Sequence, residues 1–328
     1  MLVRARAFAA LGSLALASCA VPRHAPAPAT LPPPAVVLEW RSPLHRDHPL
    51  VGRIWDARAG RFASEGELRA AVAGGRFVLL GETHDNPDHH ALEARYLAAI
   101  LDAGRRPALA FEMLDPDQQP AVNAVLTGSA PSPGALAAAV RWDDSGWPAF
   151  AMYAPIFQLG LDARLPIVAA NLSRPMARDV IHRGTAGLPE EVRALVERAG
   201  PLPPGEAKER REEMEALHCG QLPEAFLDPM VLSQRARDAQ LARSVAAGAT
   251  RDGAVLVTGA EHAREDRGAG MFLHLAGADP AQVISIAFQE VNPDARTPPA
   301  GTLPWDFVVF TPGVDRGDPC AELRPPGG

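Results

Sequence analysis

The chain has 328 residues, of which 47% are apolar, and it carries a net charge of -7. This length accommodates one large domain or two smaller ones with a sizeable core. The acidic balance and the scattered lysines and arginines argue against a nucleic-acid partner, because such a footprint concentrates positive charge on one face.

The first segment, residues 1–19, has the pattern of a signal peptide. Arg4 and Arg6 precede an apolar run that is too short to span a bilayer, and small residues precede Cys19. The ending Leu-Ala-Ser-Cys resembles a bacterial lipoprotein signal, in which the cysteine receives the lipid, whereas a plain secretory signal with an incidental cysteine is the alternative. Ala20 favours the outer membrane, by resemblance to bacterial sorting rules. We therefore expect a lipid-anchored protein on the periplasmic or cell-surface side of a bacterial outer membrane.

Composition also suggests how the rest of the chain is divided. Proline and alanine dominate the beginning of residues 20–40, which predicts an extended tether. We expect an α/β domain at 41–174 and 249–312, with a helical lobe inserted at 175–248 and a flexible tail at 313–328.

Strands and helices alternate along the expected domain. Apolar runs bounded by glycine, proline and polar residues predict buried strands, and apolar residues at helical spacing follow several of them. The expected elements are a hairpin at 54–64, a helix at 64–73 and strands at 77–80, 107–113, 165–170, 254–258, 283–288 and 307–310. This alternation predicts an α/β fold with a largely parallel, doubly wound sheet (α/β/α) and an inserted helical lobe.

The two cysteines outside the leader are Cys219 and Cys320. Export would place them in an oxidising compartment, where they are candidates for a disulfide, although the sequence does not give the distance between them. The chain contains no C-x-x-C-H motif for covalent haem attachment and no C-x-x-C zinc framework.

Polar side chains occur where the expected strands end. Glu82 and His84 follow one strand, Glu112 ends the next, Asn171 the third, and His262 follows the fourth. Any one of them could be a turn or capping residue. In open α/β sheets, however, ligands bind outside the carboxyl ends of the strands, so a shared site is the stronger interpretation.

Two kinds of chemistry suit these residue types. The imidazoles of His84 and His262, with the Glu82 carboxylate, could bind a metal ion such as iron, copper or zinc. Alternatively, Glu82, His84, Glu112 and His262 could provide a general acid and base for hydrolysis. The spacing does not decide between these alternatives.

Three further polar residues lie in the helix that follows the first of these strands. His89, His90 and Glu93 are close enough in sequence to extend either kind of site. Their position at the beginning of the helix favours solvated side chains instead.

Several dispersed motifs resemble the ChaN family of haem-binding, iron-regulated lipoproteins, over roughly residues 50–290. This family shares a superfamily with the Tiki/TraB proteins and is similar to erythromycin-esterase-like hydrolases. The resemblance implies a surface lipoprotein that binds haem, as a stacked pair across a homodimer, and takes part in haem and iron acquisition. The motifs are G-E-T-H-D-N-P-D-H-H at 81–90, F-E-M-L-D at 111–115, Q-Q-P at 118–120, W-D-D-S-G-W-P at 142–148, H-C-G-Q-L-P at 218–223, Q-R-A-R-D at 234–238 and G-A-E-H-A-R at 259–264.

A haem site needs a flat apolar wall, an axial donor from histidine or tyrosine, and arginines for the propionates. The candidate cofactor-binding residues are His84, His262, Glu82, Glu112, Tyr96, Trp142, Trp147, Tyr153, Arg237 and Arg264. The aromatic residues of 141–157 could equally be ordinary core. The chain also departs from the pattern we expect for the family, because Ala260-Glu261 stands where Asn-Gly is expected before His262. The additional carboxylate disfavours propionates and favours a cation.

The leading interpretation is thus a non-enzymatic, haem-binding lipoprotein of the outer membrane. The alternative is a metal-dependent hydrolase, a Tiki/TraB-like peptidase or esterase, that uses the two G-x-x-H motifs and a divalent metal ion. A third interpretation is a structural cell-envelope protein in which the polar residues at the strand ends only satisfy backbone groups.

Overall fold

A computed structural model describes residues 31–318 and 320–321 of the chain. The expected signal peptide, its Cys19, the first part of the tether and the end of the tail lie outside the described residues.

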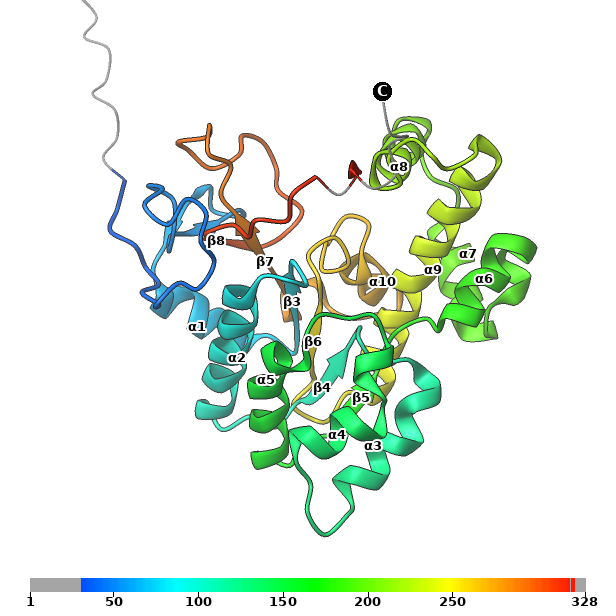
Figure 1. The fold of residues 1–328 in the computed structure, drawn as a ribbon, viewed down its shortest axis with the longest axis horizontal. Coiled ribbons are helices and arrows are strands. Elements are labelled where there is room, and N and C mark those ends of the chain that lie inside the picture. Colours follow the sequence, from blue (N-terminus) through cyan, green and yellow to red (C-terminus); the bar gives the residue numbers. More distant parts are fainter. Residues whose placement is uncertain (1–30, 319, 322–328) are drawn as a thin grey trace, which may run out of the picture. The chain divides into compact units, whose positions relative to one another are not determined.

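The sheet has eight strands in the order β2-β1-β8-β7-β3-β6-β4-β5, of which β3 to β8 are labelled in Figure 1. The six strands from β8 to β5 run parallel to one another, whereas β1 pairs in antiparallel fashion with β2 and β8. The strands are β1 (Ile54–Asp56), β2 (Arg61–Ala63), β3 (Phe77–Glu82), β4 (Ala108–Phe111), β5 (Ile167–Ala169), β6 (Ala254–Gly259), β7 (Val283–Glu290) and β8 (Phe307–Thr311). The predicted α/β class and largely parallel sheet are confirmed.

Helices connect the parallel strands. They are α1 (Glu65–Gly74), α2 (Pro87–Asp102), α3 (Gln119–Leu126), α4 (Pro133–Ala139), α5 (Phe150–Asp162), α6 (Arg174–Arg183), α7 (Glu190–Ala199), α8 (Pro204–Leu217), α9 (Glu224–Gly248) and α10 (Ala269–Leu275). Local sequence explains where two of these helices begin. Ser64 and Glu67 form a capping box for α1, and Asn86 caps α2 directly before Pro87. None of the helices in the described ranges combines the length and the apolarity needed to cross a bilayer.

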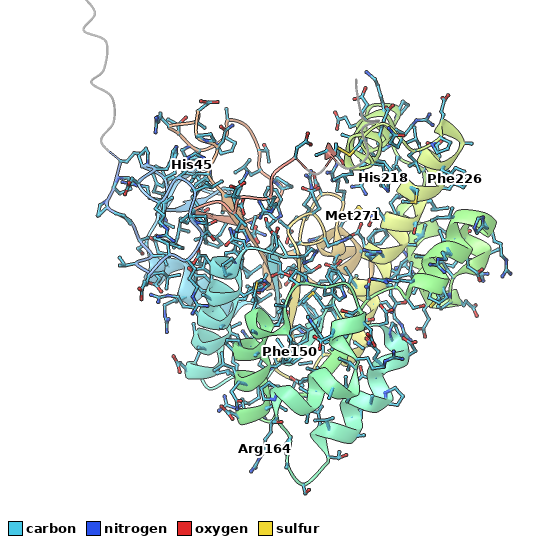
Figure 2. All side chains as sticks on the ribbon, in the orientation of Figure 1. His45, Phe150, Arg164, His218, Phe226 and Met271 are labelled. Carbon is cyan, nitrogen blue, oxygen red and sulfur yellow. A yellow bond between two sulfur atoms is a disulfide. The ribbon has the colours of Figure 1, made fainter. Side chains whose placement is uncertain are left out.

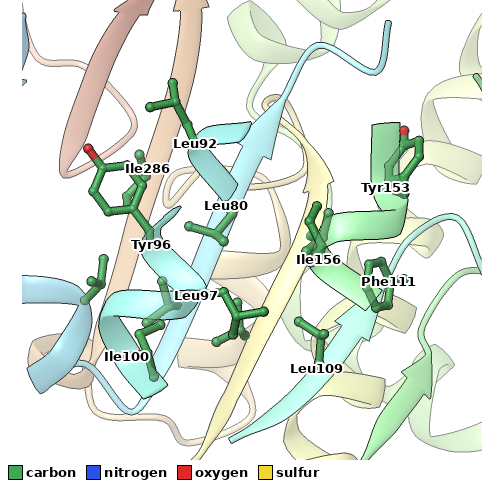
Figure 3. Packing of buried hydrophobic residues seen from close by; sticks show 14 of the residues in the cluster. Leu80, Leu92, Tyr96, Leu97, Ile100, Leu109, Phe111, Tyr153, Ile156 and Ile286 are labelled. Carbon is green, nitrogen blue, oxygen red and sulfur yellow. The ribbon is translucent and has the colours of Figure 1, made fainter. Parts of the chain in front are cut away.

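Helices cover both faces of the sheet because successive residues of each strand point to opposite sides. In β3, Val78 and Leu80 pack beneath α1, α2 and α5, whereas Phe77 and Leu79 pack with α9 and α10 on the other face. Figure 3 shows the first of these cores, in which Leu80 lies among residues of α2.

Between β5 and β6 the chain forms helices α6 to α9. The last of them is more than a peripheral element, because Ala239, Leu241 and Val245 of α9 are completely buried in the core that covers the sheet. The inserted segment therefore also supplies one of the layers of the α/β domain.

The described part of the expected tether packs on the domain. Val36 is 1% exposed and its backbone N–H donates to the carbonyl oxygen of Gly52. At the other end, Gly313 pairs with Leu44. The chain from Pro34 onward therefore contacts the edge of the sheet that contains β1 and β8.

Candidate functional site

The parallel strands bring the predicted polar residues to one edge of the sheet. Glu82 ends β3 directly beside Gly259 at the end of β6, and Glu112 follows β4, which pairs with the other side of β6. The carboxyl ends of three adjacent strands therefore meet where His84 and His262 begin the following loops. The structure thus brings Glu82, His84, Glu112 and His262 together.

Glu82 holds the ring of His84 in place. Nδ1–H of His84 donates to Oε1 of Glu82 at 2.7 Å, and the hydroxyl of Tyr153 on α5 donates to the same oxygen at 3.0 Å. The other ring nitrogen of His84, Nε2, lies against Gly259, where a Cβ atom would be only 3.1 Å from it. No described residue hydrogen bonds to this nitrogen. A glycine at this position therefore leaves space for the imidazole and keeps Nε2 accessible.

A second histidine and carboxylate pair forms from α9 and the loop after β6. Nδ1–H of His262 donates to Oδ1 of Asp238 at 2.6 Å, and its Nε2 lies 3.5 Å from Oε1 of Glu112. Thr258 and the backbone N–H of Gly259 both donate to Oε2 of Glu112. Both ring nitrogens of His262 thus face carboxylates, which distinguishes it from His84.

The pKa values follow from burial and from these contacts. Burial opposes the charge of Glu82, but the charge of His90 and the hydrogen bond from His84 outweigh it and lower the pKa of Glu82 to about 2. Burial also opposes the charge of His84, but the bond to Glu82 and the charge of Glu112 raise its pKa to about 9. In the same way, the charges of Glu112 and Asp238 overcome burial and raise the pKa of His262.

The prediction that His89, His90 and Glu93 are solvated is wrong, because all three side chains are at most 1% exposed. His89 accepts a hydrogen bond from the backbone N–H of Thr83 and contacts the hydroxyl of Thr311. Helix α2 begins against the ends of β3 and β8, so its first turn points into the protein instead of into solvent.

A cavity of about 560 Å³ opens beside His84 and His262; we call it the site cavity. Its size falls within the usual range for small-molecule sites. One wall comes from the strand ends and the other from α8 and α9. Its lining residues are Glu82, Thr83, His84, Arg210, Glu213, Met214, Leu217, Gln234, Asp238, Gly259, Ala260, Glu261 and His262.

The charges around the site cavity differ from those expected from sequence. Arg210 on α8 lines the cavity and makes no hydrogen bond or ion pair with any described residue. Arg264, the predicted propionate partner, instead pairs with Asp266 at 2.8 Å and with Glu261 at 3.3 Å. Arg267 also pairs with Glu261, at 2.6 Å. The additional carboxylate at position 261 is therefore neutralised by two guanidinium groups.

A second cavity, of about 530 Å³, lies at the ends of β4 and β5; we call it the side cavity. Trp147 lines it and also contacts the ring of His84 edge-on, with the ring centroids 4.8 Å apart. Arg237 and Asn171 line the same cavity, and Arg237 lies 3.7 Å from Glu112. Arg237 and Trp147 thus lie close to Glu112 and His84, but they line the side cavity and not the site cavity.

Three of the predicted aromatic residues lie in the core and line neither cavity. Tyr96 is completely buried between α2 and β7, where Figure 3 shows it beside Ile286. Trp142 packs against Tyr153 and Phe157, and Tyr153 reaches the site only through its hydroxyl. Most of the aromatic residues of 141–157 are therefore ordinary core residues, which was the alternative interpretation of this segment.

Sequence reasoning missed two important members of the site. Asp238 orients His262 and Arg210 is the unpaired cation of the cavity, and both come from the helices of the inserted segment. The motif Q-R-A-R-D contains Asp238, so the resemblance included a signal for it. Arg210 lies in a highly charged stretch that is typical of a solvated helix, and nothing in that stretch distinguishes it from its neighbours.

Comparisons with known proteins identify the family and the fold. A protein-family profile described as "Haem-binding uptake, Tiki superfamily, ChaN" matches residues 68–273. The chain is similar to a solved structure, "Cofacial heme binding to ChaN of Campylobacter jejuni", with 19% identity, a TM-score of 0.59, and coverage of 78% of this chain and 95% of that one. At this identity the likeness shows the fold alone.

More distant likenesses also exist. A mutant of erythromycin esterase EreC in its open conformation has 15% identity, a TM-score of 0.42, and coverage of 79% of this chain and 81% of that one. The type III effector HopBA1 has 14% identity, a TM-score of 0.41, and coverage of 75% of this chain and 92% of that one. A comparison with curated proteins found no match.

Proposed function

This chain belongs to the ChaN family of haem-binding uptake proteins in the Tiki superfamily, and from this membership we propose that it binds haem in the site cavity, with His84 as the axial ligand. The observation that carries the proposal is the hydrogen bond from Nδ1 of His84 to Glu82, which leaves Nε2 as the accessible nitrogen. A metal-binding histidine typically donates its other ring N–H to a carboxylate or a carbonyl oxygen, which fixes the orientation of the ring.

Other features of the cavity fit a porphyrin. Met214 and Leu217 provide apolar surface on α8, and the side chain of Leu217 is 75% exposed. Arg210, which has no partner among the described residues, is available for a propionate carboxylate. When bound, haem would supply an iron atom, which His84 would hold. The protein's part is to hold His84, to release the proton from its Nε2 to solvent and to cover one face of the ligand.

A hemin titration of the purified protein, followed by the Soret band, tests this proposal. We expect saturable binding by the wild type and a loss of affinity of at least about tenfold in His84→Ala, because the axial bond is removed. His45→Ala is the matched control, since His45 is an exposed histidine far from His218, at the end of α8, in Figure 2. An unchanged Soret maximum and affinity in His84→Ala would exclude this histidine as the ligand.

We further propose that the protein is a lipoprotein of the outer membrane that takes part in haem and iron acquisition. The signal-like residues 1–19 and the proline-rich segment after Cys19 support this anchoring. Metabolic labelling with a fatty-acid analogue should mark the wild type and not Cys19→Ala, and membrane fractionation should recover the labelled protein with the outer membrane. Labelling that persists in Cys19→Ala would refute the anchor.

We also propose that two copies associate when haem is bound. The support is the cofacial haem binding named for the Campylobacter jejuni protein, together with the exposed Leu217 at the rim of the site cavity. Sedimentation velocity of the apo and hemin-loaded protein tests this step. A dimer that forms only with hemin, and is lost in Leu217→Asp, is the expected result, whereas a hemin-loaded monomer contradicts it.

One observation favours a second candidate function. His262 bonded to Asp238, with Glu112 beside its Nε2, has the arrangement of a general base oriented by a carboxylate. The second candidate is therefore a hydrolase that acts on an ester or a peptide, with a divalent metal ion near His84 and His262. Metal-dependent turnover of an ester and peptide panel that disappears in His262→Ala, without a Soret change on hemin addition, would support it.

A further inference from the structure

Behind the site cavity, three buried side chains gather between β3 and α2. They are Glu82, His90 and Glu93, and one potential ligand atom of each lies within 4.8 Å of the others. Nδ1 of His90 is 2.7 Å from Oε2 of Glu82 and 3.0 Å from Oε2 of Glu93. We infer that these three residues form a binding site for a divalent transition-metal ion, such as Zn²⁺ or Mn²⁺, that adjoins the proposed haem site and shares Glu82 with it.

The ring of His90 is oriented as a metal ligand requires. Its Nε2–H donates to the backbone carbonyl oxygen of His84 at 2.9 Å. In the neutral ring, the lone pair of Nδ1 then points toward the two carboxylates. A hydrogen bond from the distal nitrogen to a carbonyl oxygen is the usual support of a metal-bound histidine.

Glu82 is supported in a similar way. The hydroxyl of Tyr153 and Nδ1–H of His84 both donate to its Oε1, which leaves Oε2 facing His90. Oε1 of Glu93 is buried and accepts no hydrogen bond from any described residue. This oxygen atom lacks the hydrogen bond that a buried carboxylate normally accepts.

The charge of the cluster also favours a cation. Glu82 and Glu93 have side chains that are 0% exposed, and the described residues that pair with them are histidines: His84 and His90 for Glu82, and His90 for Glu93. Two buried carboxylates are costly in a low-dielectric interior unless their charge is compensated. A divalent ion bound by two carboxylates and a neutral imidazole balances the charge, and the protons that the ligands held pass to solvent.

Only a small adjustment is needed to accommodate the ion. Zinc bonds to nitrogen and oxygen are about 2.0–2.2 Å, so ligand atoms around a tetrahedral ion lie roughly 3.4 Å apart. The present contacts of 2.7 and 3.0 Å are those of atoms that share a proton. Replacing this proton by the ion therefore moves the ligand atoms apart by about half an ångström.

The test uses the haem-free full-length protein, so that its result does not depend on haem binding. The protein is incubated with Zn²⁺ or Mn²⁺, desalted, and analysed for metal by mass spectrometry. We expect about one retained ion per chain and at least tenfold weaker binding in Glu93→Gln, which keeps the side-chain shape but removes the charge. Glu65→Gln is the matched control, because Glu65 on α1 pairs with Arg95 of α2, the helix that carries Glu93, and does not contact the cluster.

Equal metal retention in Glu93→Gln and Glu65→Gln would overturn the inference. If Glu93→Gln does not fold, a crystal of the wild type soaked with Zn²⁺ gives the answer through anomalous scattering. A peak between Glu82, His90 and Glu93 supports the site. A peak only at His84 and His262, or no peak in the protein, overturns it.

Discussion

The hydroxyl of Tyr153 on α5 donates to Oε1 of Glu82 at the end of β3, across a sequence separation of 71 residues. Both residues are buried, so the bond supports a carboxylate that has little contact with water. Tyr153→Phe removes the donor and should lower the free energy of unfolding by about 1.5–3 kcal/mol, the usual value for a hydrogen bond to a charged group. Urea denaturation followed by circular dichroism measures this loss.

The matched control is the other tyrosine of the chain. The hydroxyl of Tyr96 is buried and accepts or donates no hydrogen bond among the described residues. Tyr96→Phe should therefore leave the free energy of unfolding unchanged or raise it by up to about 1 kcal/mol, because an unsatisfied polar group leaves the core. Equal destabilisation by the two substitutions would show that the bond to Glu82 contributes nothing specific.

Substitutions of Arg210 and Arg264 should affect the affinity for haem differently. Arg210 lines the site cavity without a partner, so Arg210→Gln should weaken hemin binding about tenfold, which corresponds to one charged hydrogen bond. Arg264 is already paired with Asp266 and Glu261, so Arg264→Gln should change the affinity little. Hemin titration at low and high salt measures both. A larger effect of Arg264→Gln would reverse this assignment of the propionate partner.

His89 makes the stability of the protein sensitive to mild acid. Burial lowers the pKa of His89 from 6.5 to about 3, so the unfolded chain binds a proton in this interval and the folded protein does not. Its contribution to stability is therefore complete above pH 6.5 and is lost as the pH falls toward 3, at about 1.4 kcal/mol per pH unit.

His89→Gln isolates this effect, because the amide can replace both the acceptor for the Thr83 N–H and the partner of Thr311. Every other titrating group is common to the two proteins. The stability of the wild type relative to the variant should fall by about 2 kcal/mol between neutral pH and about pH 5. Urea denaturation at several pH values measures it, and parallel pH profiles would refute the buried neutral state of His89.

The disulfide between Cys219 and Cys320 joins residues that are 101 positions apart. It links the turn between α8 and α9, which lies between His218 and Phe226 in Figure 2, to the C-terminal segment. Replacing both cysteines by serine should lower the free energy of unfolding by about 2–4 kcal/mol, because the unfolded chain gains freedom. Dithiothreitol should destabilise the wild type to the same extent and leave the double variant unchanged; equal effects on both proteins would contradict this.

The sheet and the meeting of Glu82, His84, Glu112 and His262 could be predicted from the sequence. Their strands are short apolar runs bounded by glycine or proline, and the carboxyl ends of parallel strands necessarily share one edge. Gly259 shows the limit of such reasoning. It could be predicted to end a strand, whereas its closeness to Nε2 of His84 depends on the pairing of β3 with β6.

The burial of His89, His90 and Glu93 could not be predicted from helical spacing. A first helical turn normally faces solvent, and it is buried here only because the first turn of α2 packs against strand ends that are remote in sequence. The aromatic residues of 141–157 failed as a guide for a related reason. Composition identifies flat apolar side chains, but packing between α5 and the sheet decides that Trp142 and Tyr153 face the core.

The position of Arg316 has a consequence for when the site becomes complete during biosynthesis. Arg316 pairs with Asp85, the neighbour of His84, and with Glu290, although 231 residues separate it from Asp85. A ribosome synthesises all the strands of the sheet before this guanidinium exists, and Cys320, which is joined to the turn after α8, is translated later still. The ion pair that joins Asp85, beside His84, to Arg316 therefore forms only after translation has passed the sheet.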